Sequence, residues 1–284
     1  MERRNPYLDL LRLSDLRLLT AATGGAEISG DLHHHPETVE SLLERREVFE
    51  SLFNSADRDP LLVASPFLVF SALVGRVFAD LGSSTSVQEW LGPGRWLPVF
   101  AASDLHDFLV PRRRRAFLAA LLASYTKVAS GTTWERTARG WRRRRYSDLD
   151  PVQLGHLLQS AGPAQRGQVA RRMGDLSLFL AGVFPEHVAA HPLQPRDVDF
   201  LRRLLGGGGP EEVMRATGPD KGLWLLEWLG RRAYRVGAEW SREAEAADVL
   251  DVAESFGRAR RVLNLVTGRY LYPSRDRWFP SGRS

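Results

Sequence analysis

The amino-acid sequence predicts an all-α fold of roughly eight to ten helices, from which a basic loop or hairpin departs. Apolar residues recur at spacings of three and four, strand-like alternation is nearly absent, and clusters of glycine and proline divide the chain into segments of helical length. The chain has 284 residues, 43% of them hydrophobic, which is enough to bury a sizeable core. We therefore expect one compact helical domain over residues 1–284.

The first strongly amphipathic segment begins at Pro36, a residue well suited to the first position of a helix. Val39, Leu42, Phe49 and Phe53 follow on one side, and glutamates occupy the other. This pattern predicts a surface helix that packs its apolar side on the core.

The most apolar stretch, residues 61–75, carries no charged residue and is closed by Arg76. It contains Pro66 and is shorter than the roughly twenty residues that a membrane-spanning helix needs. We expect a buried core helix here and no membrane span.

A second core helix is predicted from Gln168 onward. Val169, Met173, Leu176 and Leu180 recur at steps of four and three, and phenylalanines widen the apolar face. This helix is expected to cross the centre of the core.

Two further helical stripes occupy residues 226–240 and 249–266. Because each runs for only about two to three heptads, we expect an antiparallel pair within one chain, with a homodimer through 222–266 as the alternative. Residues 270–284 are expected to form an irregular C-terminal tail.

Cysteine is absent, which excludes disulfides, thiolate zinc sites, iron–sulfur clusters and cysteine nucleophiles. Arg3 and Arg4 stand near the start, but charges interrupt the apolar region that a secretion signal would need. We expect a cytoplasmic protein that carries no cofactor.

Positive charge is concentrated between residues 111 and 148. Within this basic segment, residues 111–146 hold eleven cations and the single acid Glu135, a net charge of +10, which leaves 28 cations against 33 acids in the rest of the chain. Such a segment attracts phosphate backbones or other anionic surfaces when its charges share one surface.

Two arginine quartets and two tryptophans stand out within this segment. Aromatic residues interleaved with cations suit base stacking combined with phosphate neutralisation. The candidate residues for contact with nucleic acid or an acidic protein surface are Arg112, Arg113, Arg114, Arg115, Trp134, Arg136, Arg139, Trp141, Arg142, Arg143, Arg144 and Arg145.

The basic segment has two alternative interpretations. In the first, its arginines pair with the protein's own carboxylates or with a protein partner, and in the second they lie against a membrane surface. The quartet 112–115 is expected at the start of an apolar helix, where cations oppose the helix dipole, and this conflict favours a functional role.

Histidines offer two weak metal-binding hypotheses. His33, His34 and His35 are consecutive, so they cannot all face one ion from a helix. His187 and His191 have the i, i+4 spacing of a helical zinc pair, but no third ligand is identifiable. We expect neither group to bind a metal.

Two groups of acidic residues raise the question of catalysis. Asp175 stands in an apolar helix, where burial would raise its pKa, and Arg171 is one turn away. Asp104, His106 and Asp107 form a cluster that resembles a helix start. We expect structural roles for both.

The sequence therefore predicts a binding or regulatory protein more readily than an enzyme. The alternatives are a helical enzyme with a pocket between helices, built from Asp104, His106, Asp175, His187 and His191, with or without a metal, and a homo-oligomeric scaffold.

Overall fold

The structure is a computed structural model. It describes residues 7–24, 36–53, 59–92, 95–99, 101–127, 130–137, 140–147, 149–206, 221–241, 243–271 and 278–279. Within these ranges, side chains are described except at 36–37, 90–92, 95–96, 130–137, 140–147 and 243–245.

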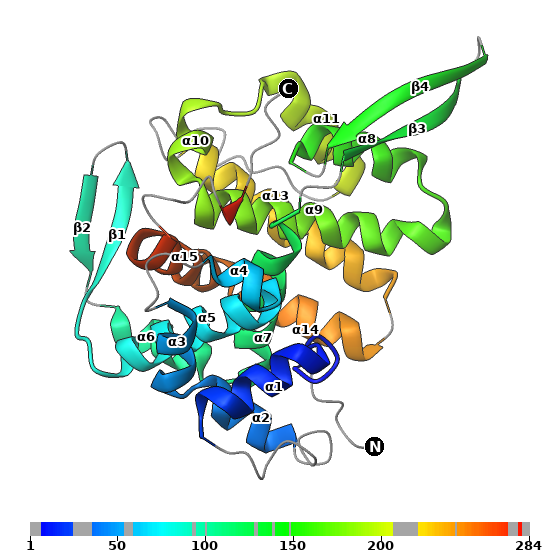
Figure 1. The fold of residues 1–284 in the computed structure, drawn as a ribbon. Helices are drawn as coiled ribbons and strands as arrows, with labels where there is room; N and C mark the ends of the chain where they lie inside the picture. Colours follow the sequence, from blue (N-terminus) through cyan, green and yellow to red (C-terminus); the bar gives the residue numbers. More distant parts are fainter. Residues whose placement is uncertain are drawn as a thin grey trace. The chain divides into compact units, whose positions relative to one another are not determined.

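The described residues form fourteen α-helices, one π-helical turn and two separate two-stranded sheets (Figure 1). The helices are α1 (Leu13–Ala22), α2 (Pro36–Leu43), α3 (Arg46–Phe53), α4 (Pro60–Val63), α5 (Pro66–Gly82), α6 (Ala102–Leu109), α7 (Arg112–Ser124), α8 (Pro151–Ser160), α9 (Pro163–Val183), α10 (Pro185–Ala190), α11 (Pro195–Leu205), α13 (Lys221–Glu239), α14 (Glu243–Glu254) and α15 (Phe256–Val266). The strands are β1 (Val87–Gly92), β2 (Arg95–Val99), β3 (Ser130–Thr137) and β4 (Gly140–Ser147), and the π-helix is η2 (Thr267–Leu271).

The all-α prediction is confirmed, and the helix count exceeds the eight to ten expected. The difference comes from short helices such as α4 and α10, and from a break at Ser255 that divides the predicted segment 249–266 between α14 and α15. A four-residue or six-residue helix is too short for a 3.6-residue period to be recognised in sequence.

The chain divides into two compact units. Unit 1 comprises Met1–Val87, Val99–Thr126 and Gly268–Trp278, and unit 2 comprises Gln88–Pro98, Lys127–Thr267 and Phe279–Ser284. The expectation of a single domain over 1–284 stays a prediction.

Helix α5 is the central element of unit 1. Ser65 caps it by accepting a hydrogen bond from the Leu68 backbone N–H, and Pro66 occupies its first turn. Every residue from Phe67 to Gly75 is buried, and α7, α6, α3 and α2 pack around it. The apolar stretch 61–75 is therefore largely a core helix, but its first residues lie on α4, where Leu62 is 83% exposed.

A buried carboxylate joins α1 to the start of α5. Asp15 accepts a hydrogen bond from the Arg12 backbone N–H at 2.8 Å, which caps α1. Its other oxygen accepts from the Ser65 backbone N–H at 2.9 Å. One side chain thus satisfies backbone donors at the beginnings of two helices, which would otherwise remain unpaired.

Helices α9 and α13 form the core of unit 2, and glycine allows their close approach. At Gly174 of α9, a Cβ atom would lie 2.5 Å from the ring of Tyr234 on α13. At Gly237 of α13, a Cβ would lie 3.1 Å from the backbone nitrogen of Arg171. The predicted central role of the segment from Gln168 therefore rests on small residues as much as on its apolar stripe.

The apolar stripe of α13 is covered within the chain. Leu226, Leu229 and Ala233 are buried, and α13 packs on α9 and α14. The side chains that prompted the homodimer alternative through 222–266 thus have partners in unit 2. Homodimerisation itself stays a prediction.

The described part of the C-terminal tail is ordered by packing. In unit 1, Trp278 contacts the rings of Phe53 and Phe70. In unit 2, Phe279 is buried against Phe179. Residues 272–277 and 280–284 lie outside the described residues.

No helix among the described residues is long and apolar enough to cross a membrane. This agrees with the expectation for the stretch 61–75.

Substitution of Gly174 tests the α9–α13 contact. Gly174→Ala places a methyl group 2.5 Å from the Tyr234 ring, closer than van der Waals contact, so we expect a loss of about 1–3 kcal/mol in the free energy of unfolding, as is typical of overpacking. Urea denaturation followed by circular dichroism measures it. Gly162→Ala is the control because a Cβ there meets nothing within 4 Å; equal effects of the two substitutions would contradict the prediction.

Candidate anion-binding surface

The arginine quartet 112–115 occupies the first turn of α7, as expected. Arg115 is only 5% exposed and points into unit 1. Its guanidinium donates hydrogen bonds to the carbonyl oxygens of Leu109 and Val110 and to the Glu44 carboxylate, the last at 2.5 Å. It also lies over the ring of Phe78, 4.4 Å from the centroid. Arg115 is therefore a structural residue.

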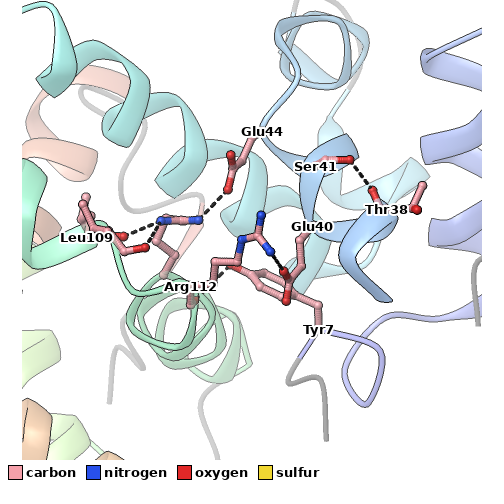
Figure 2. A network of polar contacts seen from close by, with 9 residues as sticks. Tyr7, Thr38, Glu40, Ser41, Glu44, Leu109 and Arg112 are labelled. Atoms are coloured by element: carbon pink, nitrogen blue, oxygen red, sulfur yellow. Dashed lines mark hydrogen bonds and ion pairs between the residues drawn. The ribbon is translucent and has the colours of Figure 1, made fainter. Parts of the chain in front are cut away.

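Arg112 makes a second internal ion pair, with Glu40 of α2 (Figure 2). Glu40 is buried, and the Tyr7 hydroxyl donates to the backbone carbonyl of Arg112 at 3.3 Å. Burial raises the pKa of Tyr7 to about 12, although the nearby Arg115 cation acts in the opposite direction. Tyr7 is thus a neutral hydrogen-bond donor throughout the physiological pH range.

The position of the quartet has an electrostatic explanation. Arg114 donates to the carbonyl oxygen of Phe108 at 3.0 Å, and Arg115 bonds the next two carbonyls, so both guanidiniums lie at the C-terminal end of α6. Helix C-termini carry unpaired carbonyls and a partial negative charge that favour cations. The charges that oppose the dipole of α7 therefore stabilise the end of α6.

The second quartet lies in a regular antiparallel hairpin, which was one of the predicted forms of the excursion. Strands β3 and β4 pair from Ser130 opposite Ser147 to Thr137 opposite Gly140. In unit 2 the hairpin extends beyond α8 (Figure 1).

The register divides the hairpin residues between two faces, because directly opposite positions share a face and successive positions alternate. Trp134 is opposite Arg143, Arg136 is opposite Trp141, and position 145 falls on the same face. We call these five residues the Trp/Arg face.

The other face of the hairpin has a different composition. Glu135 is opposite Arg142, Thr133 is opposite Arg144, and Tyr146 is opposite glycine. Both predicted tryptophans therefore fall on the Trp/Arg face. Arg139 lies outside the described residues.

The two quartets belong to different units, Arg112–Arg115 to unit 1 and Arg142–Arg145 to unit 2. The prediction that they share one surface is untested. Arg112, Arg114 and Arg115 have internal partners in unit 1. Contact of Arg113 and of the hairpin residues with an anionic partner stays a prediction.

The histidine pair of α10 is placed side by side. His187 and His191 stack with ring centroids 4.5 Å apart, and a ring nitrogen of His191 lies 3.2 Å from the His187 carbonyl oxygen. No cluster of three or more metal-ligating side chains occurs in the part of the chain that the structure describes. His33, His34 and His35 lie outside it.

Asp104, His106 and Asp107 lie on α6, where Asp104 is in the first turn. The His106 ring stacks on Phe78 at 4.6 Å, and its Nδ1 is 3.8 Å from the exposed carboxylate of Asp107. His106 thus packs beside the Arg115 site as an aromatic ring.

Asp175 is held in the α9–α13 contact. Its carboxylate accepts a hydrogen bond from the Tyr234 hydroxyl at 2.9 Å. Burial raises the pKa of Asp175, while the Arg171 cation and the Tyr234 hydrogen bond partly oppose that rise. This arrangement is the structural one that the sequence predicted.

Sequence reasoning missed a polar pocket of about 530 Å³ in unit 2. Its lining includes Trp224, Arg258, Arg260 and Arg261, and none of the residues proposed for a catalytic site. The close spacing of Arg258, Arg260 and Arg261 in the sequence could have indicated a cluster of cations on α15. Their acidic partner Glu89 is too distant in sequence to be recognised.

No protein-family model, curated protein or solved structure matches the chain. Functional inference therefore rests on the geometry of the described residues.

A structural role for Arg115 predicts a large loss of stability on its removal. Arg115→Leu leaves Glu44 and two carbonyls without their partner, so we expect a loss of about 3 kcal/mol in urea denaturation. Arg17→Leu, on an exposed residue of α1, should change stability by less than about 0.5 kcal/mol. A loss of stability as small as that of Arg17→Leu would contradict the structural role of Arg115.

The raised pKa of Asp175 predicts a pH-dependent effect of Asp175→Asn. The folded state binds the proton of the Asp175 carboxyl group more tightly than the unfolded state does. The contribution of this group to stability is therefore full below its pKa in the unfolded state, and it is lost as the pH rises through its pKa in the folded state. The asparagine cannot ionise and keeps an oxygen for Tyr234. We expect the variant to be more stable than the parent near neutral pH and equal to it below about pH 4, measured by urea denaturation. A constant difference at all pH values would contradict this, and Asp107→Asn on an exposed side chain is the control.

Proposed function

We propose that the protein is a non-enzymatic helical binding protein whose β3–β4 hairpin contacts single-stranded nucleic acid. One observation carries the proposal: the register assigns Trp134, Trp141, Arg136, Arg143 and Arg145 to the same face of the hairpin. Aromatic rings stack on bases while arginines neutralise phosphates, and this combination tolerates many sequences.

The charge distribution supports the same proposal. Residues 111–146 carry net +10 in a chain whose remainder is acidic, and Arg112, Arg114 and Arg115 of the first quartet have partners within unit 1. We therefore assign the contact with a polyanion to the hairpin arginines. We place this role in the cytoplasm, where such ligands occur.

Binding to a single-stranded oligonucleotide of about 16 nucleotides tests the proposal. Fluorescence anisotropy across a salt series should show affinity falling linearly on logarithmic axes, by about 0.7 per phosphate neutralised. Arg143→Gln with Arg145→Gln should reduce both the affinity and this slope. Trp134→Ala should reduce the affinity by roughly 1–3 kcal/mol and leave the slope unchanged.

The two faces of the hairpin provide a matched control. Arg142→Gln with Arg144→Gln removes the same charge from the other face and should weaken binding less. Equal losses from both pairs would contradict the assignment to one face, and no binding at low salt would contradict the function. An acidic protein partner would then be the next hypothesis.

A further inference from the structure

Two successive cross-strand pairs of the hairpin place four members of the Trp/Arg face at the corners of a rectangle. Trp134 is opposite Arg143, and the next pair on the same face places Arg136 opposite Trp141. Positions two residues apart on a strand share a face, so all four positions are neighbours. The tryptophans therefore occupy one diagonal of the rectangle, and the arginines occupy the other.

The diagonal placement separates the two tryptophans by the space of one base. Directly opposite positions have Cβ atoms about 5 Å apart, whereas diagonal positions are roughly 7 Å apart. Bases stack at intervals of about 3.4 Å, so a base between two aromatic rings needs about 7 Å. The register thus gives Trp134 and Trp141 a separation that admits one base, which directly opposite tryptophans would lack.

The arginine diagonal suits the backbone of the same nucleotide. Arg136 and Arg143 occupy the two corners on either side of the tryptophan diagonal. Each internal nucleotide of a strand is likewise flanked by two phosphates, and a planar guanidinium binds phosphate oxygens bidentately. One base and its two phosphates therefore match the four positions.

Among the paired residues 130–137 and 140–147, no acid shares the Trp/Arg face. Its remaining positions hold Arg145 and residues with a hydroxyl group. The acid Glu135 is on the other face, where it is opposite Arg142. The face that carries the tryptophans therefore places no carboxylate beside a bound phosphate.

The four positions lie toward the turn of the hairpin. Pairing ends at Thr137 opposite Gly140, next to the pair of Arg136 and Trp141. The other end of β4 leads into α8, and in unit 2 the hairpin extends beyond that helix (Figure 1). The rectangle is thus displaced from the helix that contacts β4.

We infer that the hairpin takes one unpaired purine base between Trp134 and Trp141. Arg136 and Arg143 bind the phosphates on the two sides of that base. This mode of binding rests on the proposed function of the hairpin and adds that one nucleotide is recognised at a time. It is reversible and involves no covalent step.

The chemistry of stacking gives this arrangement a preference among nucleic acids. A purine offers two fused rings to each tryptophan and a pyrimidine only one, and preferences of non-specific binders follow stacking strength. A base within a duplex is already stacked and paired, and its extraction costs free energy. The hairpin therefore selects unpaired strands that contain purines.

Short strands of abasic nucleotides test the inference, because they keep the phosphates and lack the bases. Fluorescence anisotropy at one salt concentration compares such a strand with strands that carry one central adenine, one central thymine or two adjacent adenines. One adenine should raise the affinity about tenfold and one thymine about threefold. A second adenine should add at most about twofold, because the rings hold a single base.

Substitution of either tryptophan distinguishes a shared base from two separate stacking surfaces. If both rings hold the same base, Trp134→Ala and Trp141→Ala should each remove most of the gain from one adenine and leave the affinity for the abasic strand unchanged. If each ring stacked its own base, either variant would keep most of that gain. Trp134→Phe combined with Trp141→Phe keeps two rings and should retain most of it, which separates loss of stacking from loss of the fold.

Arg143→Gln should weaken binding of every strand and leave the ratio between the adenine strand and the abasic strand unchanged. Tyr146→Ala is the matched control, because position 146 is an aromatic residue on the other face, opposite glycine. It should leave both the affinity and the ratio unchanged.

A gain from adenine that survives in both tryptophan variants, or that is multiplied again by a second adenine, would overturn the shared base and leave the proposed function standing. Equal gains from adenine and thymine would overturn the preference for purines. No binding of any strand at low salt would overturn both this mode of binding and the proposed function.

Discussion

The close contact between α9 and α13 determines the organisation of unit 2. Glycine at position 174 lets the Tyr234 ring lie on α9, and the Tyr234 hydroxyl then reaches the neighbouring carboxylate of Asp175. Glu227 lies one turn before Gly230, on the side of α13 that also carries Gly230 and Tyr234, and it lines the polar pocket together with Trp224. The same contact that fills the core therefore fixes one wall of the polar pocket.

The two arginine quartets have the same composition but lie in different structural surroundings. In unit 1, Arg114 and Arg115 satisfy carbonyls at the end of α6, and Arg112 pairs with a buried glutamate. In unit 2, the described arginines of the hairpin lie on a two-stranded element, where Arg136 and Arg143 are each opposite a tryptophan. Net charge is a sum over both groups and does not show which arginines are paired within the protein.

Periodicity predicted the long helices well, because α5, α9 and α13 each present several turns of apolar residues to a core. It failed for α4, which is shorter than two periods, and for the strands 87–99, whose residues lack apolar alternation. The site was harder still to predict. Glu44 is 71 residues from Arg115, and Glu89 is far from Arg261, so only the folded chain reveals which arginines are paired.

The β3–β4 hairpin has one further physical consequence. A two-stranded sheet has no interior strand, so each strand has an outer edge that can pair with a strand of another molecule. A dense row of like charges resists such pairing, because two copies of the hairpin would bring their arginines together. The charges at positions 142 to 145 thus oppose aggregation of the protein through strand pairing.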